Sequence, residues 1–151
     1  MRVKDLMTTN VVTIEASESC HAAVERMARA GIRHLPVVDA RGRLVGVVTD
    51  RDLRHHLFAP AVFSEVGRVP VESHLRAVPV VRIMSTPVIT VGPDDELELA
   101  ARTMLEDKVG SLPVVAGGRV VGIITETDLL RLIVREDACC HEVATIVVSY
   151  P

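Results

Sequence analysis

The amino-acid sequence predicts an α+β fold made of two tandem β-α-β-β-α repeats. The segment GVVTDRDL at residues 46–53 returns as GIITETDL at 122–129, and LPVV occurs at both 35–38 and 112–115. The two LPVV copies are 77 residues apart, and the spacing shortens to 76 after the glycine turn that follows them. Similarity at one fixed spacing is the signature of repeated structural units. We therefore interpret the chain as a tandem duplication.

Each repeat is expected to open with a short strand and a helix. The strands are expected at 11–13 and 88–90, where β-branched residues favour extended backbone. The helices are expected to begin at the capping residues Ser17 and Asp94, with acidic side chains in the first turn. Apolar residues at helical spacing then predict the face of each helix that packs in the core: Cys20, Ala23, Val24 and Met27 in the first copy, and Leu97, Ala100, Ala101 and Met104 in the second.

The second half of each repeat reads as a two-stranded hairpin followed by a helix. Gly31 is expected to end the first helix, and glycine turns at 41–42 and 117–118 join the strands of the hairpins. A second helix is expected to begin after Thr49 or Thr125. These elements divide the chain into a first repeat at 1–57, a connector at 58–80, a second repeat at 81–136 and a tail at 137–151 that is expected to form a strand.

Composition and charge narrow the class of protein. The 151 residues are 48% hydrophobic and 25% charged, which is ordinary for a globular protein. The net charge of −3 provides no overall basic field, so nucleic acid is an unexpected partner. The apolar runs are too short to span a bilayer, and the first residues lack the apolar region of a signal peptide. We therefore expect a cytoplasmic protein without membrane association.

The repeated T-x-x-D pattern has two interpretations. Thr49 with Asp52, and Thr125 with Asp128, stand where a strand turns into a helix whose first N–H groups lack helical partners. A carboxylate there can accept hydrogen bonds from two ribose hydroxyls, while the threonine hydroxyl and the free N–H groups bind a phosphate. This combination suits a nucleotide. The alternative is that each pair is a helix capping box that holds no ligand.

These features together resemble the cystathionine-β-synthase (CBS) domain family: the order of elements, the LPVV strand, the glycine turn and the closing G-h-h-T-x-x-D-L pattern, in which h is an apolar residue. The resemblance covers about Val3 to Leu57 and about Val81 to Val134. It implies a stand-alone pair of CBS repeats related by a pseudo-twofold axis. In such pairs the Thr and Asp positions commonly hold the ribose and phosphate of an adenine nucleotide in the cleft between the repeats.

The resemblance also implies where the adenine lies. The ring is expected between residues 13–14 or 90–91 and the apolar residues at 36–37 or 113–114, with backbone groups reading its edge. The chain has one Tyr, two Phe and no Trp, so aromatic stacking platforms are scarce. This scarcity argues against a protein that binds single-stranded nucleic acid by stacking.

The duplication is imperfect where the phosphates are expected. Arg33 and His34 occupy a position at which family members often place phosphate-binding basic residues, whereas the second repeat has Gly110 and Ser111. The alternative is that Arg33 and His34 form a solvated basic turn. The nucleotide site implied by the resemblance comprises Thr13, Ile14, Arg33, His34, Pro36, Val37, Thr49, Arg51, Asp52, Thr90, Val91, Ser111, Pro113, Val114, Thr125 and Asp128.

We therefore expect a regulatory or sensor module that binds AMP, ADP, ATP or a related adenosyl ligand between its repeats and requires no cofactor. The sequence contains no serine-hydrolase, phosphate-loop or zinc-protease motif, so no enzymatic activity and no catalytic residue are expected. Family pairs usually associate as twofold homodimers, so the resemblance implies a homodimer that acts on an unidentified client protein.

Two other functions remain open. The first is a structural dimerisation adaptor whose clefts stay empty. The second is a redox or metal sensor that uses Cys139, Cys140 and His141. Adjacent cysteines lack the C-x-x-C spacing of most metal sites, and three cysteines do not make a disulfide framework, so no metal is expected.

Overall fold

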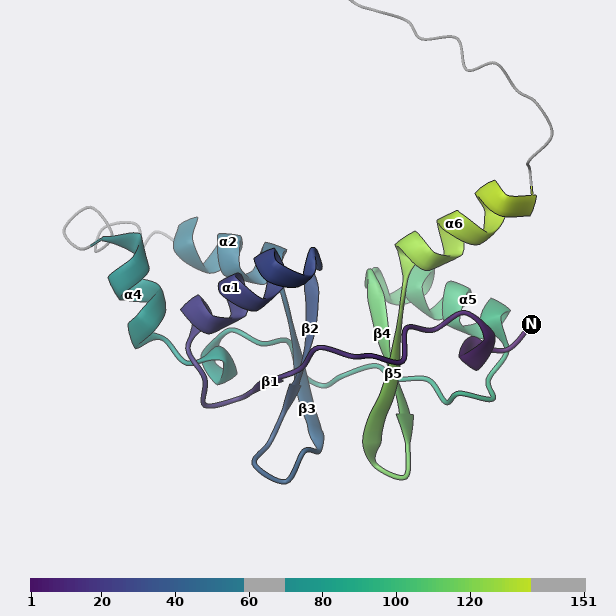
Figure 1. Cartoon of the computed structure of the whole chain (residues 1–151), viewed down its shortest axis with the longest axis horizontal. Coiled ribbons are helices and arrows are strands. Elements are labelled where there is room, and N and C mark those ends of the chain that lie inside the picture. Colours follow the sequence, from purple (N-terminus) through teal and green to yellow (C-terminus); the bar gives the residue numbers. More distant parts are fainter. Residues whose placement is uncertain (59–69, 137–151) are drawn as a thin grey trace, which may run out of the picture.

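The computed structural model describes residues 1–58 and 70–136 of the chain. The strand predicted at 137–151 and the residues Cys139, Cys140 and His141 lie outside the described residues. The described part is an α+β structure of two similar halves, which confirms the predicted fold class (Figure 1). Each half is preceded by a short 3-10 turn, η1 at Val3–Asp5 and η2 at Val80–Arg82.

The first half contains three strands and two helices. β1 (Ile14–Glu15) pairs in parallel with β2 (His34–Val38), which pairs antiparallel with β3 (Leu44–Thr49). α1 (Cys20–Ala30) packs against β2, and α2 (Asp50–Phe58) follows β3 directly and packs against it. Gly31 ends α1 in the left-handed conformation, with φ at 63°, as the sequence predicts.

The second half repeats this arrangement with a shorter first strand. β4 (Ser111–Ala116) pairs antiparallel with β5 (Arg119–Thr125), and the first strand is reduced to a single parallel bridge between Val91 and Val114. α5 (Leu97–Asp107) precedes the hairpin and α6 (Glu126–Glu136) follows it. Both hairpins have a register shift at the same place, after Val37 and after Val114. The two repeats therefore share this irregularity in strand pairing as well as the order of their elements.

The first strand and the helix start predicted in each repeat were wrong by a few residues. β1 lies at 14–15 rather than 11–13, and α1 is capped by Ser19, whose hydroxyl oxygen accepts from the Ala22 N–H at 3.2 Å, rather than by Ser17. α5 has Glu96 at its N-cap position rather than Asp94, which instead bonds Lys4 at 2.7 Å. The physical reason is tertiary: backbone bonds tie the residues at the start of each helix to distant segments, as from the Cys20 N–H to the Val78 O and from the Leu97 N–H to the Met1 O.

One residue of the predicted core stripe is not buried. Cys20, Ala23 and Met27 lie in the core of the first half, but the Val24 side chain is 40% exposed, and its counterpart Ala101 is half-buried. The four apolar residues cover a wide arc of the helix surface, and the sheet contacts only part of that arc. A side chain at the edge of the arc therefore stays exposed to solvent. Leu97, Ala100 and Met104 are buried as predicted.

The connector contains a helix that the sequence did not indicate. α4 (Val71–Ala77) packs on α1, with Leu75 buried in the first core and His74 Nε2 lying 3.3 Å from His56 Nε2 of α2. At seven residues this helix is too short to show a clear helical period.

The two halves exchange their leading segments. Val3 is buried in the core of the second half beside Leu97 and Ala100, whereas Val80 is buried in the core of the first half. Figure 1 shows the N-terminus beside α5, from which the chain crosses the centre of the molecule to reach β1. The chain after α4 makes the reverse crossing. Each core therefore needs a segment that belongs, by sequence, to the other repeat.

The crossing segments are held by short antiparallel bridges. Thr8 and Ile123 exchange backbone hydrogen bonds of 2.9 and 3.0 Å, and Ser85 and Val47 exchange bonds of 2.8 and 3.2 Å. Each bridge fixes a crossing segment on the last strand of a hairpin, next to the start of the helix that follows.

Candidate functional site

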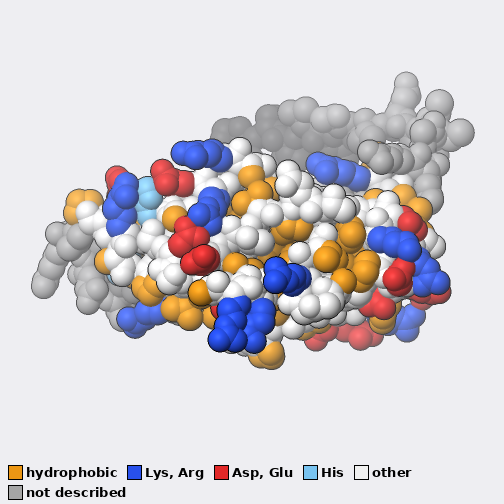
Figure 2. All heavy atoms as spheres, turned by 60° about the horizontal axis from the view of Figure 1, so that its bottom comes forward, with side chains coloured by type: hydrophobic (Ala, Val, Ile, Leu, Met, Phe, Trp, Pro, Cys, Tyr) orange, Lys and Arg blue, Asp and Glu red, His pale blue; other side chains and the backbone are white. Residues whose placement is uncertain are grey.

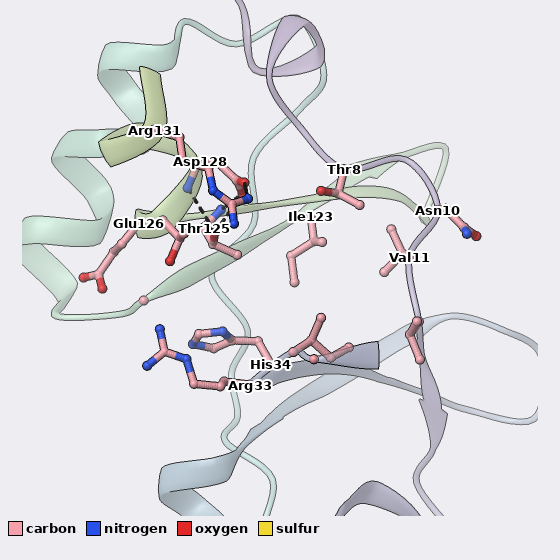
Figure 3. A pocket seen from close by; sticks show the side chains of 15 residues that line it. Thr8, Asn10, Val11, Arg33, His34, Ile123, Thr125, Glu126, Asp128 and Arg131 are labelled. Carbon is pink, nitrogen blue, oxygen red and sulfur yellow. Dashed lines mark hydrogen bonds and ion pairs between the residues drawn. The ribbon is translucent and has the colours of Figure 1, made fainter. Parts of the chain in front are cut away.

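Two cavities lie between the halves, and both halves contribute to each. The first cavity, of about 340 Å³, is lined by Thr8, Asn10, Val11, Val12, Gly31, Ile32, Arg33, His34, Gly110, Ile123, Thr125, Glu126, Thr127, Asp128 and Arg131 (Figure 3). The second cavity, of about 380 Å³, is lined by Arg33, His34, Val47, Thr49, Asp50, Arg51, Asp52, Arg54, Ser85, Lys108, Val109, Gly110, Ser111 and Glu126. These volumes lie at the lower end of the range for small-molecule sites.

The Thr–Asp pair at each helix start is a complete capping box. The Asp128 Oδ2 atom accepts from the Thr125 N–H at 2.9 Å and from the Thr125 hydroxyl at 2.7 Å, and the Asp128 N–H donates to Thr125 Oγ1 at 3.3 Å. Thr49 and Asp52 make the same three bonds at 2.9, 2.9 and 3.1 Å. The capping interpretation of T-x-x-D is therefore correct as geometry.

The capping box does not use the whole carboxylate. Only Oδ2 of Asp128 takes part in it, and Oδ1 lies 4.0 Å from the Arg131 guanidinium. In Figure 3 the Asp128 carboxylate lies on the wall of the first cavity, across from Thr8. An oxygen with free lone pairs at the mouth of a cavity can accept further hydrogen bonds from a ligand. Capping and ligand binding are thus compatible in one residue.

The first cavity has an apolar wall made by the crossing segment. Val11 and Val12 lie on this segment, Ile32 follows α1, and Ile123 lies on β5 where Thr8 is bridged to it. Three chain segments far apart in sequence therefore meet around one apolar space. Such a wall with a few polar groups beside it is the usual composition of a small-molecule site.

Four residues line both cavities: Arg33, His34, Gly110 and Glu126. The Glu126 carboxylate and the His34 ring meet at Gly110, where an added Cβ would lie 3.1 Å from His34 Nε2 and 3.4 Å from Glu126 Oε2. Burial of the ring lowers the pKa of His34, and the neighbouring Arg33 lowers it further against the opposing effect of nearby carboxylates. The lowered pKa means that the His34 ring is predominantly neutral at neutral pH.

The structure places some of the predicted site residues on the cavities. Arg33, His34, Thr125 and Asp128 line the first cavity. Arg33 and His34 also line the second, together with Thr49, Arg51, Asp52 and Ser111.

The other predicted residues do not line either cavity. Ile14, Pro36, Val37, Val91, Pro113 and Val114 are buried, and Thr13 and Thr90 lie on neither lining. The reason is the parallel pairing of Ile14 with Val37 and of Val91 with Val114, which turns these residues into the two cores.

Five of the lining residues that sequence reasoning missed come from the crossing segments. Thr8, Asn10, Val11, Val12 and Ser85 reach the cavities because each segment crosses to the opposite half. A repeat alignment gives no sign of such an exchange. Ile32 and Val109, by contrast, occupy matched positions just before LPVV, so a comparison of the two repeats could have identified them.

Figure 2 shows hydrophobic, basic and acidic side chains interspersed on the face that carries the hairpin turns. Within residues 1–58 and 70–136, no helix is long and apolar enough to cross a membrane, and no group of three metal-binding side chains occurs. Burial raises the pKa of the Cys20 thiol to about 11, so this cysteine is unreactive at neutral pH.

Comparisons with known proteins agree with this geometry. An uncharacterised protein of Methanocaldococcus jannaschii is 38% identical over 133 residues, which are 87% of this chain, and the chain spans 32% of the length of that relative. The CBS domain pair of protein MJ0100, solved with 5′-methylthioadenosine and S-adenosyl-L-methionine, is 28% identical with a TM-score of 0.72, over 91% of this chain and 98% of that one.

A third comparison is with CBSX2, solved in complex with AMP. It is 32% identical with a TM-score of 0.70, over 89% of this chain and 97% of that one. A family model for the CBS domain matches residues 3–59 and 80–135, which are the two repeats. The chain belongs to the CBS domain family.

Proposed function

We propose that the chain is a regulatory module that binds an adenosyl ligand such as AMP in the first cavity and acts on a client protein without catalysing a reaction. The observation that carries the proposal is the meeting, in one cavity, of an apolar wall, a partly free carboxylate and a basic group on the opposite side. The ligands bound by MJ0100 and CBSX2 have an adenosine moiety in common, which supports the same choice here.

Each part of such a ligand has a matching part of the cavity. Val11, Val12 and Ile32 offer an apolar slot for adenine, and the backbone of the crossing segment is available to read its edge. The free oxygen of Asp128 accepts from ribose hydroxyls. A phosphate reaches Arg33 and His34, of which the guanidinium carries a permanent charge in a forked geometry. AMP thus uses both repeats, and its binding reports on their relative position.

The predicted homodimer belongs to the same proposal. Leu130, Ile133 and Val134 of α6 are exposed, and so is Leu105 of α5. Large exposed apolar side chains on neighbouring helices are typical of a surface that associates. This observation also favours the second candidate function, a dimerisation adaptor with empty clefts.

Calorimetric titration of AMP separates the two candidates. Asp128→Ala removes the ribose acceptor, so AMP affinity should fall about ten- to a hundredfold, as expected for a hydrogen bond to a charged group. Asp52→Ala removes the equivalent capping box from the other helix and is the matched control, which should leave affinity for the first cavity unchanged. Equal affinities in wild type and both variants would contradict the proposed site, and no AMP binding at all would favour the adaptor.

A further inference from the structure

Helix α4 is attached to helix α2 by a pair of histidines. α4 lies beside α1 and α2, at the end of the first half that is farthest from the second half (Figure 1). The Nε2 atoms of His56 on α2 and His74 on α4 are 3.3 Å apart, whereas the centroids of the two rings are 5.5 Å apart. The nitrogens therefore lie on the edges of the rings that face each other. This is the arrangement of a hydrogen bond between two imidazoles.

A hydrogen bond between two imidazoles needs at least one ring with a free lone pair. One Nε2 atom donates its proton, and the other accepts with its lone pair. When both rings are protonated, both Nε2 atoms carry a proton, no acceptor remains, and two positive charges face each other. The contact between His56 and His74 therefore tolerates one added proton and is lost with the second.

The charges around the pair do not offset this repulsion. Among residues 1–58 and 70–136, neither ring forms an ion pair with a carboxylate, although Asp52 lies one turn before His56 on α2. Burial lowers the pKa of His56, and the neighbouring His74 and Arg82 lower it further. The paired rings therefore resist the second proton more than two separate histidines do.

A third histidine, on α1, faces acidic side chains of its own helix and of α4. His21 Nε2 lies 3.5 Å from Glu72 Oε1 of α4, and His21 Nδ1 lies 3.7 Å from Glu25 Oε2. Glu72 also pairs with Arg76 at 2.8 Å. The side chains of Glu25 and Glu72 are 57% and 63% exposed, so protonation of His21 strengthens the contact of α4 with α1 only slightly. The response of α4 to acid is therefore set by its contact with α2.

The second repeat has an apolar residue where the first has His56. The corresponding residue is Leu132 of α6, which packs on the core of the second half. An apolar side chain thus satisfies the packing at this position. The histidine in the first repeat therefore adds a chemical property that the fold does not need.

α4 is short enough to leave its place while the rest of the first half stays folded. It has seven residues, of which Leu75 is buried. The chain after α4 is fixed independently, because the Cys20 N–H donates to Val78 O at 2.8 Å and the Val80 N–H donates to Glu18 O at 2.8 Å. Opening of α4 is therefore expected to end at Val78 and to uncover the apolar surface under Leu75.

We propose that His56 and His74 form a pH-sensitive contact: in mild acid both rings are protonated, α4 separates from α2, and the apolar surface under Leu75 becomes accessible. A free histidine has a pKa of about 6.5, so the separated rings bind protons more readily than the paired rings, and acid favours the separated state. The contact is complete at neutral pH and is lost progressively as the pH falls below about 6.5. Such a contact makes the module responsive to acidity as well as to a ligand.

Hydrogen–deuterium exchange of the full chain, without ligand and with a metal chelator, measures the opening of α4. Amide protection, corrected for the intrinsic pH dependence of exchange, is compared between about pH 7.5 and about pH 5. Protection in α4 should fall about two- to tenfold relative to α5, the change expected from the loss of one hydrogen bond. The double variant His56→Gln with His74→Gln has two polar side chains that do not titrate, so it should not show this fall.

The chain offers a matched control beside the pair. His55 is the preceding residue on α2 and is exposed, so His55→Gln should keep the response of the wild type. His56→Leu copies the residue of the second repeat, so it is expected to fold and should also remove the response. In an NMR titration of the histidine rings, His74→Gln should raise the pKa of His56, a result that burial alone does not produce.

Three results would overturn the inference. The first is protection in α4 that falls equally in the wild type and in the double glutamine variant, and the second is a fall of the same size in α5. The third is a pKa of His56 that does not change in His74→Gln. Because no ligand is present, none of these results depends on AMP binding in the first cavity.

Discussion

At the scale of single residues, the Thr–Asp pairs cap a helix and, in Asp128, leave one carboxylate oxygen outside the capping box. One carboxylate oxygen caps the helix, and the other remains available at the cavity. Sequence reasoning treated these roles as alternatives because a spacing pattern does not say which oxygen is used. The same ambiguity applies to Arg33 and His34, which line cavities yet form no ion pair among the described residues.

The capping role predicts a stability loss that ligand binding does not explain. Asp52→Ala and Asp128→Ala each remove a capping box, so each should lower the free energy of unfolding by about 1 kcal/mol. Urea denaturation without ligand measures both. A loss in only one variant would show that the two boxes, alike in the structure, differ in strength, and no loss in either would contradict the capping role.

His34 predicts a pH dependence of stability. Its pKa is lowered in the folded chain, mainly by burial, so the unfolded chain binds a proton more readily. The free energy of unfolding should therefore fall as the pH drops below the unfolded pKa of about 6.5, until the pH passes the folded pKa. Urea denaturation between pH 7.5 and about pH 5 should show a steeper fall in the wild type than in His34→Gln. Parallel curves would contradict the assignment.

At the scale of elements, the hairpins and the helices of the two repeats followed from the sequence, and the connector helix α4 and the crossings did not. LPVV, the glycine turns and the helical spacing of Cys20, Ala23 and Met27 are local signals, and all of them were correct. The helix starts were displaced because backbone bonds beside them go to residues far away in the sequence, such as the bond from the Cys20 N–H to the Val78 O at 2.8 Å and that from the Leu97 N–H to the Met1 O at 3.0 Å. A local pattern does not encode such a partner.

The crossings depend on two glycines, which gives a prediction for Gly46. A Cβ at Gly46 would overlap the sulfur of Met84, and a Cβ at Gly122 would overlap that of Met7. Gly46→Ala should therefore lower the free energy of unfolding by about 1–3 kcal/mol through overpacking. Thermal denaturation of Gly46→Ala, Met84→Ala and the double variant forms the test. If the alanine at 46 costs as much in the Met84→Ala background, the close contact is not the cause.

At the scale of the whole molecule, the two repeats form one unit, because each core contains a segment of the other repeat. A ligand in the first cavity would touch one crossing segment as well as both hairpins. Its binding energy therefore acts on the relative position of the halves, which is the physical basis for a regulatory role.

The exposed apolar residues of α5 and α6 predict self-association. Leu105 is 79% exposed and Leu130 is 62% exposed, so a second copy is expected to cover them. Light scattering at micromolar concentration should give the mass of a dimer, and Leu130→Glu with Ile133→Glu should give that of a monomer with an unchanged circular dichroism spectrum. A wild-type monomer would contradict this prediction.

The central claim, that the cleft between the repeats binds an adenosyl ligand, is tested most directly by thermal denaturation with AMP, ADP, ATP, NAD and S-adenosylmethionine in turn. A ligand that binds the folded state alone stabilises it by about 2.7 kcal/mol at a hundred times its Kd, so at least one melting temperature should rise by several degrees. The rise should shrink in Asp128→Ala relative to its own ligand-free melt. Unchanged melting temperatures with all five ligands would contradict the claim and leave the dimerisation adaptor as the function of the chain.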